Sequence, residues 1–537
     1  MRLNLQGIRN TEEWIEKGYE MPQFDIEKVW AETKENPFWI HFGAGNLFRA
    51  FHAGVVQNLL NQGVLDRGLI VAEGFDYEII EKLYKPCDNL TIDVTLKADG
   101  TISKAVIASI AEALPLDSDD KKSYQRLTDI FGKDSLQMAT FTITEKGYSL
   151  VNARGEILSD VKRDFEEGSQ NPHSYMGKVT ALLYARYLAG QKPIAMVSTD
   201  NCSHNGDKLK AAIDAFAKEW IKNGKIDPGF ENYINSEKVS FTWSMIDKIT
   251  PRPDPFVESV LKADGVENVE PVITARKTYA APFVNSEETE YLIIEDRFPN
   301  GREKLEKGGL VFTDREKVDK VEKMKVCTCL NPLHTALAIF GCLLGYNKIA
   351  DEMKDPQLVN LIKQIGYQEG LPVVTDPGII NPKDFIDTVI HVRLTNTFMP
   401  DTPQRIATDT SQKLAIRFGE TIKAYMESKE LESSSLRMIP LVFAGWIRYL
   451  MGVDDSGKKM ELSPGPMLET LCPYAEKLEL GSNQDVEKII GDILKMDQIF
   501  GVDLYKAGLA EKVCTYLKEM LTGTGAVRNT LKEYLPE

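Results

Sequence analysis

Apolar and polar residues follow two different patterns along the chain, and the first of them fills the region from residue 37 to residue 250. Short apolar runs of strand length alternate there with segments in which apolar residues recur at helical spacing. Glycine or polar residues stand at or directly after the ends of most of these runs, as at 37–42, 68–74 and 193–199. Strands that alternate with helices in this way predict an α/β fold with a doubly wound sheet.

The second half of the chain has an almost entirely helical pattern. Apolar residues repeat at three- and four-residue steps in five segments, which are 332–350, 383–394, 403–427, 434–452 and 484–496. The preceding stretch, 285–325, is charged and is broken by Pro299, Gly301 and a Gly308-Gly309 pair. We therefore expect an N-terminal dinucleotide-binding domain over residues 1–315 and a mostly α-helical domain over residues 316–537.

A glycine-rich turn, GAGNL, follows the first apolar run at once and leads into a helix. Gly43 permits the tight turn, and Gly45 lets the backbone approach a pyrophosphate at the helix N-terminus. The third glycine of the usual pattern is absent, because Phe48 stands in its place. This context of strand, turn and helix predicts a dinucleotide site formed by Gly43, Ala44, Gly45, Asn46 and Leu47.

Two carboxylates follow the next predicted strand. Glu73 lies at its end, and Asp76 comes three residues later. A carboxylate at this place binds the ribose and repels the additional phosphate of NADP, so either residue would favour NAD. The alternative is that both are ordinary loop carboxylates.

Polar residues also end two later strands of the predicted sheet. One strand runs into Thr144, Glu145 and Lys146, and another runs into Asp200 and Asn201. The carboxyl ends of strands are where an open α/β sheet binds its ligands. We expect Thr144 and Asp200 to contact the cofactor.

A third candidate region is the stretch KVCTCLNPLHTALAIFGCLLGY, from Lys325 to Tyr346. Pro332 suits the first position of a helix with Asn331 as its N-cap, which places His334 near the same helix end. Lys325 is expected on the incoming extended segment. A base, an amide and an imidazole that converge there could polarise a carbonyl and move its proton. The simpler interpretation is a common helix start with a capping histidine and a solvated lysine.

The segment DTPQRIATDTSQK is also informative. With Asp401 or Thr402 as the cap, Arg405, Asp409 and Lys413 would lie four residues apart along one helix side, over roughly 12 Å. The side is either a substrate-binding surface or an exposed face with two salt bridges.

Composition narrows the class of protein. A net charge of −16 argues against nucleic-acid binding. No uninterrupted apolar run reaches the roughly 18 residues of a membrane span, and the N-terminus lacks the apolar core of a signal peptide. The seven cysteines are scattered and lack metal-ligand spacing, which predicts reduced thiols and no zinc site. We expect a cytoplasmic protein with no membrane partner.

Six motifs in order together resemble the long-chain mannitol dehydrogenase family, whose members are zinc-independent polyol and sugar-acid oxidoreductases. The motifs are GAGNLFRAFHA, TITEKGY, DNCSHNG, SMIDKITP, the lysine-asparagine-histidine stretch and DTPQRIATDTSQK. The resemblance implies a Rossmann-type domain, a helical C-terminal domain and an active site in the cleft between them. It also implies NAD as cofactor, a monomer or weak dimer, and a keto sugar acid and its aldonate, D-fructuronate and D-mannonate, as the substrate pair.

The resemblance further implies a role for each matching residue. Lys325 would be the general acid/base, Asn331 and Asn201 would bind the reacting oxygen, and His334 would orient the substrate. Asp247, Arg405 and Lys413 would hold the rest of the sugar chain, with Glu145 near the lysine. One departure is that five residues separate Lys325 from Asn331 where the family has four, and a bulge could absorb the additional residue.

Two other functions stay open at this stage. A relative within the family could act on a neutral polyol such as mannitol, or on the tagaturonate and altronate pair, although Lys146 offers a charge that a neutral polyol would not need. A non-catalytic NAD(H)-binding sensor is the alternative of another class. The complete set of Lys325, Asn331, His334 and Asn201 argues against that sensor.

Overall fold

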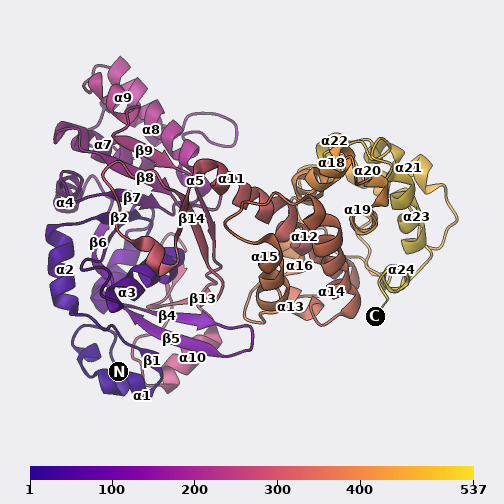
Figure 1. Cartoon of the computed structure of the whole chain (residues 1–537), viewed down its shortest axis with the longest axis horizontal. Helices are drawn as coiled ribbons and strands as arrows, with labels where there is room; N and C mark the ends of the chain where they lie inside the picture. Colours follow the sequence, from indigo (N-terminus) through magenta and orange to yellow (C-terminus); the bar gives the residue numbers. More distant parts are fainter. Residues whose placement is uncertain (537) are drawn as a thin grey trace. The chain divides into compact units, whose positions relative to one another are not determined.

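The computed structural model describes residues 1–536 and divides into two compact units (Figure 1). The first unit comprises Met1–Lys97 and Thr101–Asp319. The second comprises Ala98–Gly100 and Lys320–Glu537. All of the named strands belong to the first unit.

A six-stranded parallel sheet forms the centre of the first unit, in the order β6-β3-β2-β7-β8-β9. Its strands are β2 (Trp39–Phe42), β3 (Leu69–Glu73), β6 (Ile110–Pro115), β7 (Met138–Phe141), β8 (Ile194–Ser198) and β9 (Val239–Thr242). The chain adds strands on one side of β2 and then returns to add β7, β8 and β9 on the other. The predicted doubly wound α/β fold is confirmed, and its topological switch point lies between β2 and β7.

Helices connect these strands and build the core with them. They include α2 (Ile26–Glu35), α3 (Ala53–Asn61), α4 (Lys121–Phe131), α7 (Tyr175–Leu188) and α8 (Asn205–Lys222). The strands β2, β3, β7 and β8 are buried along their whole length, which explains why each reads as a continuous apolar run. Fully buried aromatic residues such as Phe216 and Trp220 on α8 fill the space between helix and sheet.

Three smaller sheets complete the first unit. A β-hairpin is formed by β4 (Thr91–Leu96) and β5 (Ile102–Ile107), which pair antiparallel around a turn containing Gly100. The stretch 285–325, expected to contain the domain boundary, includes the division between the units at Asp319 and Lys320 and also contributes strands to two of these sheets. These strands are β13 (Phe283–Glu287), β14 (Tyr291–Glu295) and β15 (Val311–Thr313). Their shortness and the charged loops between them concealed them in the sequence pattern.

The second unit is almost entirely helical, as predicted. Its central helix, α12 (Asn331–Leu344), packs against α14 (Pro356–Lys363), α16 (Pro403–Ile406) and α19 (Met438–Tyr449). Nearly every residue of α12 is buried, which accounts for its strongly apolar composition. The other longer helices are α15 (Pro382–Thr388), α18 (Glu420–Glu427), α20 (Leu468–Ala475), α21 (Val486–Leu494), α23 (Ala510–Met520) and α24 (Ala526–Tyr534).

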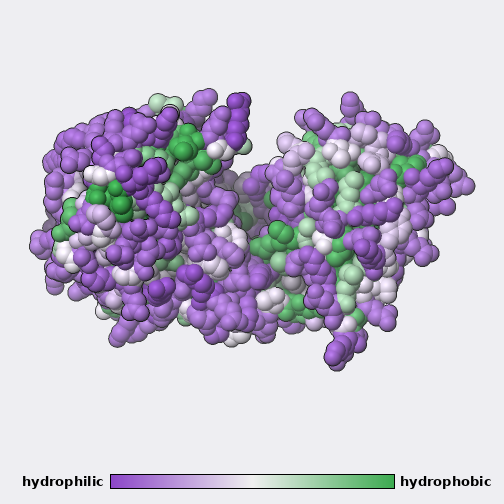
Figure 2. All heavy atoms as spheres, turned by 90° about the horizontal axis from the view of Figure 1, so that it is seen from above, coloured by the Kyte–Doolittle hydropathy of each residue, from purple (hydrophilic) through white to green (hydrophobic). Residues whose placement is uncertain are grey.

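The consecutive helical segments over Arg315–Leu344 are long and apolar enough to cross a membrane by length and composition alone. However, 78% of the apolar window is buried inside the structure, as in the core helix of a globular unit. Figure 2 shows a surface that is mostly hydrophilic, with hydrophobic residues in separate patches.

Candidate active site

A cavity of about 560 Å³ lies in the first unit, where strands β2, β3 and β7 end. Its walls come from the glycine turn, the segment after β7 and the start of α7. Of the residues predicted to bind cofactor or substrate, five line it, namely Gly43, Gly45, Glu73, Thr144 and Lys146. The cavity therefore occupies the position at which an open α/β sheet binds its ligand.

The two glycines of the turn serve different purposes. Gly43 has a φ of +109°, and a Cβ there would lie 2.3 Å from the carbonyl oxygen of Thr142. Gly45 has open space, since a Cβ there would meet no atom within 4 Å. The helix that follows passes into a π-helical segment, η2 (Phe48–His52), in which Phe48 is fully buried. Its first amides have no acceptor within the helix, so they are suited to a pyrophosphate.

Glu73 holds this turn from the neighbouring strand. Its carboxylate accepts hydrogen bonds from the backbone N–H groups of Ala44 (2.8 Å), Phe75 (2.7 Å) and Asp76 (2.9 Å). Burial raises the pKa of Glu73, while these amides act in the opposite direction. The Asp76 carboxylate accepts the hydroxyls of Thr274 and Thr278 and does not line the cavity. Of the two predicted ribose-binding acids, the structure places only Glu73 at the cavity.

Asp200 acts behind the cavity wall. Its carboxylate accepts hydrogen bonds from the N–H groups of Ile143 (3.0 Å) and Thr144 (2.8 Å) and from the hydroxyl of Tyr148 (2.6 Å). Thr144 has a φ of +62°, so these bonds stabilise a left-handed backbone position at the cavity. Burial raises the pKa of Asp200. Asp200 does not line the cavity, whereas Thr144, which it positions, does; contact of either residue with a cofactor stays a prediction.

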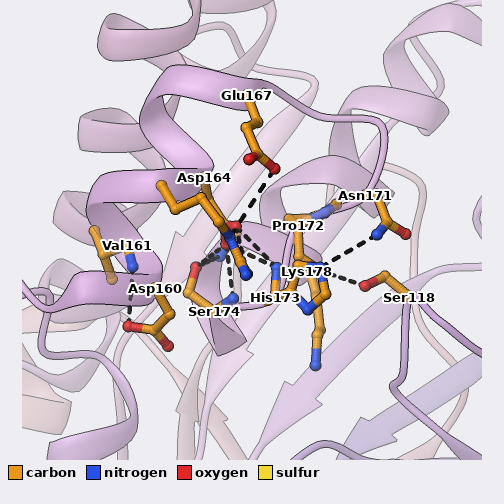
Figure 3. A network of polar contacts seen from close by, with 12 residues as sticks. Ser118, Asp160, Val161, Asp164, Glu167, Asn171, Pro172, His173, Ser174 and Lys178 are labelled. Carbon is orange, nitrogen blue, oxygen red and sulfur yellow. Dashed lines mark hydrogen bonds and ion pairs between the residues drawn. The ribbon is translucent and has the colours of Figure 1, made fainter.

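Part of the cavity lining belongs to a polar network that was not anticipated from the sequence and that Figure 3 shows. Buried Asp164, on α6 (Ser159–Glu167), accepts hydrogen bonds from the N–H groups of His173 (2.9 Å) and Ser174 (2.7 Å) and from the Ser174 hydroxyl (2.5 Å). Ser174 caps α7, and it lines the cavity together with Asp160 and Val161. The Ser174 cap was the one local signal that could have indicated this network.

The candidate proton-transfer residue lies in the second unit. Lys325 is buried and begins a π-helical segment, η6 (Lys325–Cys329), in which the N–H of Leu330 donates to the Lys325 carbonyl oxygen at 3.1 Å. The expectation that Lys325 lies on an extended segment is therefore wrong. Leu330 occupies the N-cap position, and Asn331 is the first residue of α12 rather than its cap. The additional residue between Lys325 and Asn331 is absorbed by a widened helical turn and not by a β-bulge.

His334 lies in the first turn of α12 with little exposed surface. Its Nε2 is 3.7 Å from the nearer carboxylate oxygen of Asp401 and has no hydrogen-bond partner within residues 1–536. Burial lowers its pKa to about 3, and the positive charges of Arg417, Arg393, Arg405 and Lys413 contribute in that order. His334 is thus neutral at physiological pH, and its buried Nε2 makes no hydrogen bond.

The expected single helix through Arg405, Asp409 and Lys413 does not form. Helix α16 starts with Thr402 accepting the Arg405 N–H, as predicted, but it ends at Ile406. Asp409 has a φ of +55°, and a new helix, α17 (Thr410–Leu414), begins after it. The alternative of two salt bridges to Asp409 is also wrong, because Arg405 pairs with Asp401 and Lys413 donates to the carbonyl oxygen of Thr408. A left-handed residue breaks the helical register on which both interpretations depended.

Two arginines near His334 were missed by the sequence analysis. Arg393 is buried at the end of η9 (Val389–Arg393), and Arg417 lies in η10 (Ala415–Gly419). Arg417 Nη1 donates to the hydroxyl of Thr335, which in turn donates to the carbonyl oxygen of Asn331 at 2.8 Å. The sequence signal that could have indicated Arg417 is its position four residues after Lys413, one helical turn from a predicted substrate-binding residue.

The remaining predicted substrate residues belong to the first unit. Asn201 follows β8 on an exposed turn, and Asp247 is buried at the end of β10 (Ser244–Asp247). Glu145 lies on α5 (Thr144–Gly147) and forms an ion pair with Lys208. That Asn201, Asp247 and Glu145 meet Lys325 at one substrate stays a prediction. No group of three or more His, Cys, Asp or Glu side chains within residues 1–536 is arranged to hold a metal ion.

A doubly wound sheet whose glycine turn opens into a ligand-sized cavity, joined to a helical unit with a buried lysine, defines a two-domain Rossmann-type oxidoreductase. The family model described as the mannitol dehydrogenase Rossmann domain matches residues 38–307. The model of the mannitol dehydrogenase C-terminal domain matches residues 317–521. The chain belongs to the mannitol dehydrogenase family, whose members act on the CH–OH groups of polyols and sugar acids.

Individual relatives cover nearly the whole chain. The D-mannonate oxidoreductase of Thermotoga maritima is 52% identical over 99% of both chains, and that of Escherichia coli is 27% identical over 88% of this chain and 91% of its own. The solved mannitol 2-dehydrogenase of Pseudomonas fluorescens, in a ternary complex with NAD and D-mannitol, is 25% identical over 100% of both chains with a TM-score of 0.67. A substrate-free D-sorbitol dehydrogenase structure shares the fold, with 23% identity over 97% of this chain and 98% of its own and a TM-score of 0.78.

Proposed function

We propose that this protein is an NAD-dependent oxidoreductase that interconverts D-fructuronate and D-mannonate. The observation that carries the proposal is a group of four cationic side chains whose positive charges lower the pKa of His334. These cations gather around one residue although the chain as a whole has a net charge of −16. Such a group suits a substrate that bears a carboxylate, and a neutral polyol would not require it. The similarity to the D-mannonate oxidoreductase of Thermotoga maritima supports the same substrate class.

The first unit offers a fitting site for the cofactor. The cavity, the open space at Gly45 and the helix amides after it suit a pyrophosphate and its nucleosides. The carboxylate of Glu73 at the cavity favours a free ribose over a phosphorylated one, and therefore NAD over NADP. When bound, the nicotinamide group would supply or accept the hydride.

The residues of the second unit would manage the proton and the orientation of the substrate. Lys325 would protonate the carbonyl oxygen of the keto acid during reduction and take the proton back during oxidation. Asn331, together with Asn201, would donate hydrogen bonds to that oxygen as its negative charge develops. Neutral His334 would orient the substrate by a hydrogen bond from its ring.

The rest of the substrate would be held by charged and polar side chains. Arg405, Lys413 and Asp247 are proposed to bind the distal hydroxyl and carboxyl groups. Glu145 is proposed to lie near the amine of Lys325. The burial of Lys325 supports this arrangement, because it limits competition from water for the transferred proton.

A substrate panel tests the proposal. Initial rates would be measured from the loss of NADH absorbance with fructuronate, tagaturonate and fructose, and again with NADPH. We expect fructuronate with NADH to give the highest rate. A higher rate with fructose would favour a neutral polyol as substrate, and a higher rate with tagaturonate would favour the altronate reaction. Tight NADH binding without turnover of any of the three would support a sensor.

A further inference from the structure

We infer that Arg417 binds the carboxylate of the substrate and thereby selects sugar acids over neutral polyols. The inference rests on the proposed function and names the residue responsible for its substrate class. Arg417 lies outside the motifs on which the family resemblance depends, and it enters the site from η10.

The first step of the argument is the charge of Arg417. Its guanidinium is largely buried, and burial lowers the pKa of this group to about 10. No Asp or Glu within residues 1–536 pairs with it, and its hydrogen bond goes to a neutral hydroxyl, that of Thr335. Burying a cation without a nearby anion raises the free energy of the folded protein. An anionic ligand bound to Arg417 would offset this unfavourable free energy.

Two of the neighbouring cations already have partners. Arg405 forms an ion pair with Asp401, and Lys413 donates a hydrogen bond to the carbonyl oxygen of Thr408. Arg417 contributes the largest charge effect on His334. It therefore lies near the candidate substrate-orienting residue and lacks the carboxylate partner that Arg405 has.

Two nitrogens of the Arg417 guanidinium, which together form a planar fork of donors, are available to bind a ligand. One nitrogen, Nη1, donates a hydrogen bond to the hydroxyl of Thr335. The other two, Nη2 and Nε, do not belong to the fully buried side-chain atoms that lack a hydrogen-bond partner. A guanidinium with two such nitrogens can bind both oxygens of a carboxylate, which a lysine ammonium cannot do in the same planar manner. The hydrogen-bond chain from Arg417 through Thr335 to the Asn331 carbonyl ties this fork to the N-terminus of α12.

The experiment compares Arg417→Met with the wild-type enzyme on an acid and a neutral substrate. The ratio of kcat/KM for fructuronate to kcat/KM for fructose would be measured with NADH, together with inhibition by mannonate and by mannitol. A charged hydrogen bond contributes about 1.5–3 kcal/mol, so we expect the ratio to fall about 10- to 100-fold, mainly through a higher KM for fructuronate. Inhibition by mannonate should weaken by a similar factor, whereas inhibition by mannitol should not.

Three further variants distinguish recognition of the substrate carboxylate by Arg417 from a role of Arg417 in holding the N-terminus of α12. Thr335→Val removes the hydroxyl that connects Arg417 to Asn331 but keeps the guanidinium, so both substrates should be affected to a similar extent. Arg417→Lys keeps the charge but loses the fork, and the ratio should fall by an intermediate factor. Lys423→Met removes an exposed cation that pairs with Glu420, and its ratio should equal that of the wild type.

The outcomes are distinguishable. If Arg417→Met lowers kcat/KM equally for the acid and the neutral substrate, Arg417 is only a positioning residue and the inference is overturned. An unchanged ratio in both Arg417 variants has the same consequence while the proposed function survives. A wild-type enzyme that does not reduce fructuronate overturns the proposed function and the inference with it. If Arg417→Met does not fold, the ratio measured for Arg417→Lys decides.

Discussion

Glu73 accepts a hydrogen bond from the backbone N–H of Ala44 at 2.8 Å, and this bond connects the end of β3 to the glycine turn after β2. The same carboxylate also accepts the amides of Phe75 and Asp76. An acid expected to contact the ribose thus also shapes the loop on which the pyrophosphate is proposed to bind. The two roles are compatible, because a carboxylate has about four sites for accepting hydrogen bonds.

Replacing Glu73 by Gln is expected to weaken NADH binding about 10-fold or more, because an amide nitrogen cannot accept an N–H and a buried donor is left unsatisfied. Asp76→Asn should have a smaller effect, since Asp76 lies outside the cavity lining. Fluorescence titration with NADH and NADPH measures both affinities. Glu81→Gln, at an exposed ion pair with Lys85, is the control. Equal loss in the Glu73 and Asp76 variants would contradict the assignment.

The two glycines of the turn should respond differently to alanine. Gly43→Ala places a Cβ 2.3 Å from a carbonyl oxygen at a φ of +109°, so the variant should lose stability as well as NADH binding. Gly45→Ala meets no protein atom within 4 Å and should keep the melting temperature while it weakens NADH binding. Thermal unfolding with and without NADH measures both effects. If Gly45→Ala binds NADH normally, the pyrophosphate does not approach the backbone at this turn.

Lys325→Ala should lower kcat by about 100- to 10,000-fold, which is the usual contribution of a positioned acid/base. NADH affinity should be retained, because the cofactor cavity is formed by residues of the first unit. Steady-state rates and NADH titration on the same preparation separate the two quantities. The control is Lys317→Ala, an exposed lysine on α11 (Arg315–Met324) that pairs with Asp314. Near-normal turnover of Lys325→Ala would remove this lysine from the mechanism.

Glu352 gives a prediction on stability against pH. Its carboxyl group is fully buried beside α12, and neither oxygen has a hydrogen-bond partner within residues 1–536. Burial, with a smaller effect from the charge of Asp355, raises its pKa from 4.5 to about 9. The folded protein therefore keeps a proton that the unfolded chain releases, and the free energy of unfolding falls as pH rises from about 4.5 to about 9.

Glu352→Gln removes this titration and keeps the shape of the side chain. We expect its melting temperature to fall less than that of the wild type between pH 6 and pH 9, because no buried carboxyl has to ionise. Glu420→Gln, at an exposed ion pair with Lys423, should follow the wild-type profile. Parallel profiles for wild type and Glu352→Gln would show that Glu352 does not titrate as described.

Local patterns predicted much of the fold. The buried parallel strands appeared as continuous apolar runs, because both of their faces are covered by helices. The turn at Gly43 was recognisable because strand, glycine and helix follow one another directly in the chain. The helical unit was recognisable from the spacing of apolar residues. In contrast, the short strands β13, β14 and β15 were missed, since pairing with distant strands stabilises them more than local preference does.

The sequence alone determined the doubly wound sheet, the glycine turn, the helical second half and the lysine, asparagine and histidine of the candidate site. These features depend on residues close together in the chain, whose spacing reflects the periods of helix and strand. Only the tertiary structure decided that Lys325 begins a π-helical turn and that Asp409 breaks the expected helix. It also brought Arg417 to Thr335, 82 residues away in sequence. Contacts of this kind depend on how helices pack, so no local pattern records them.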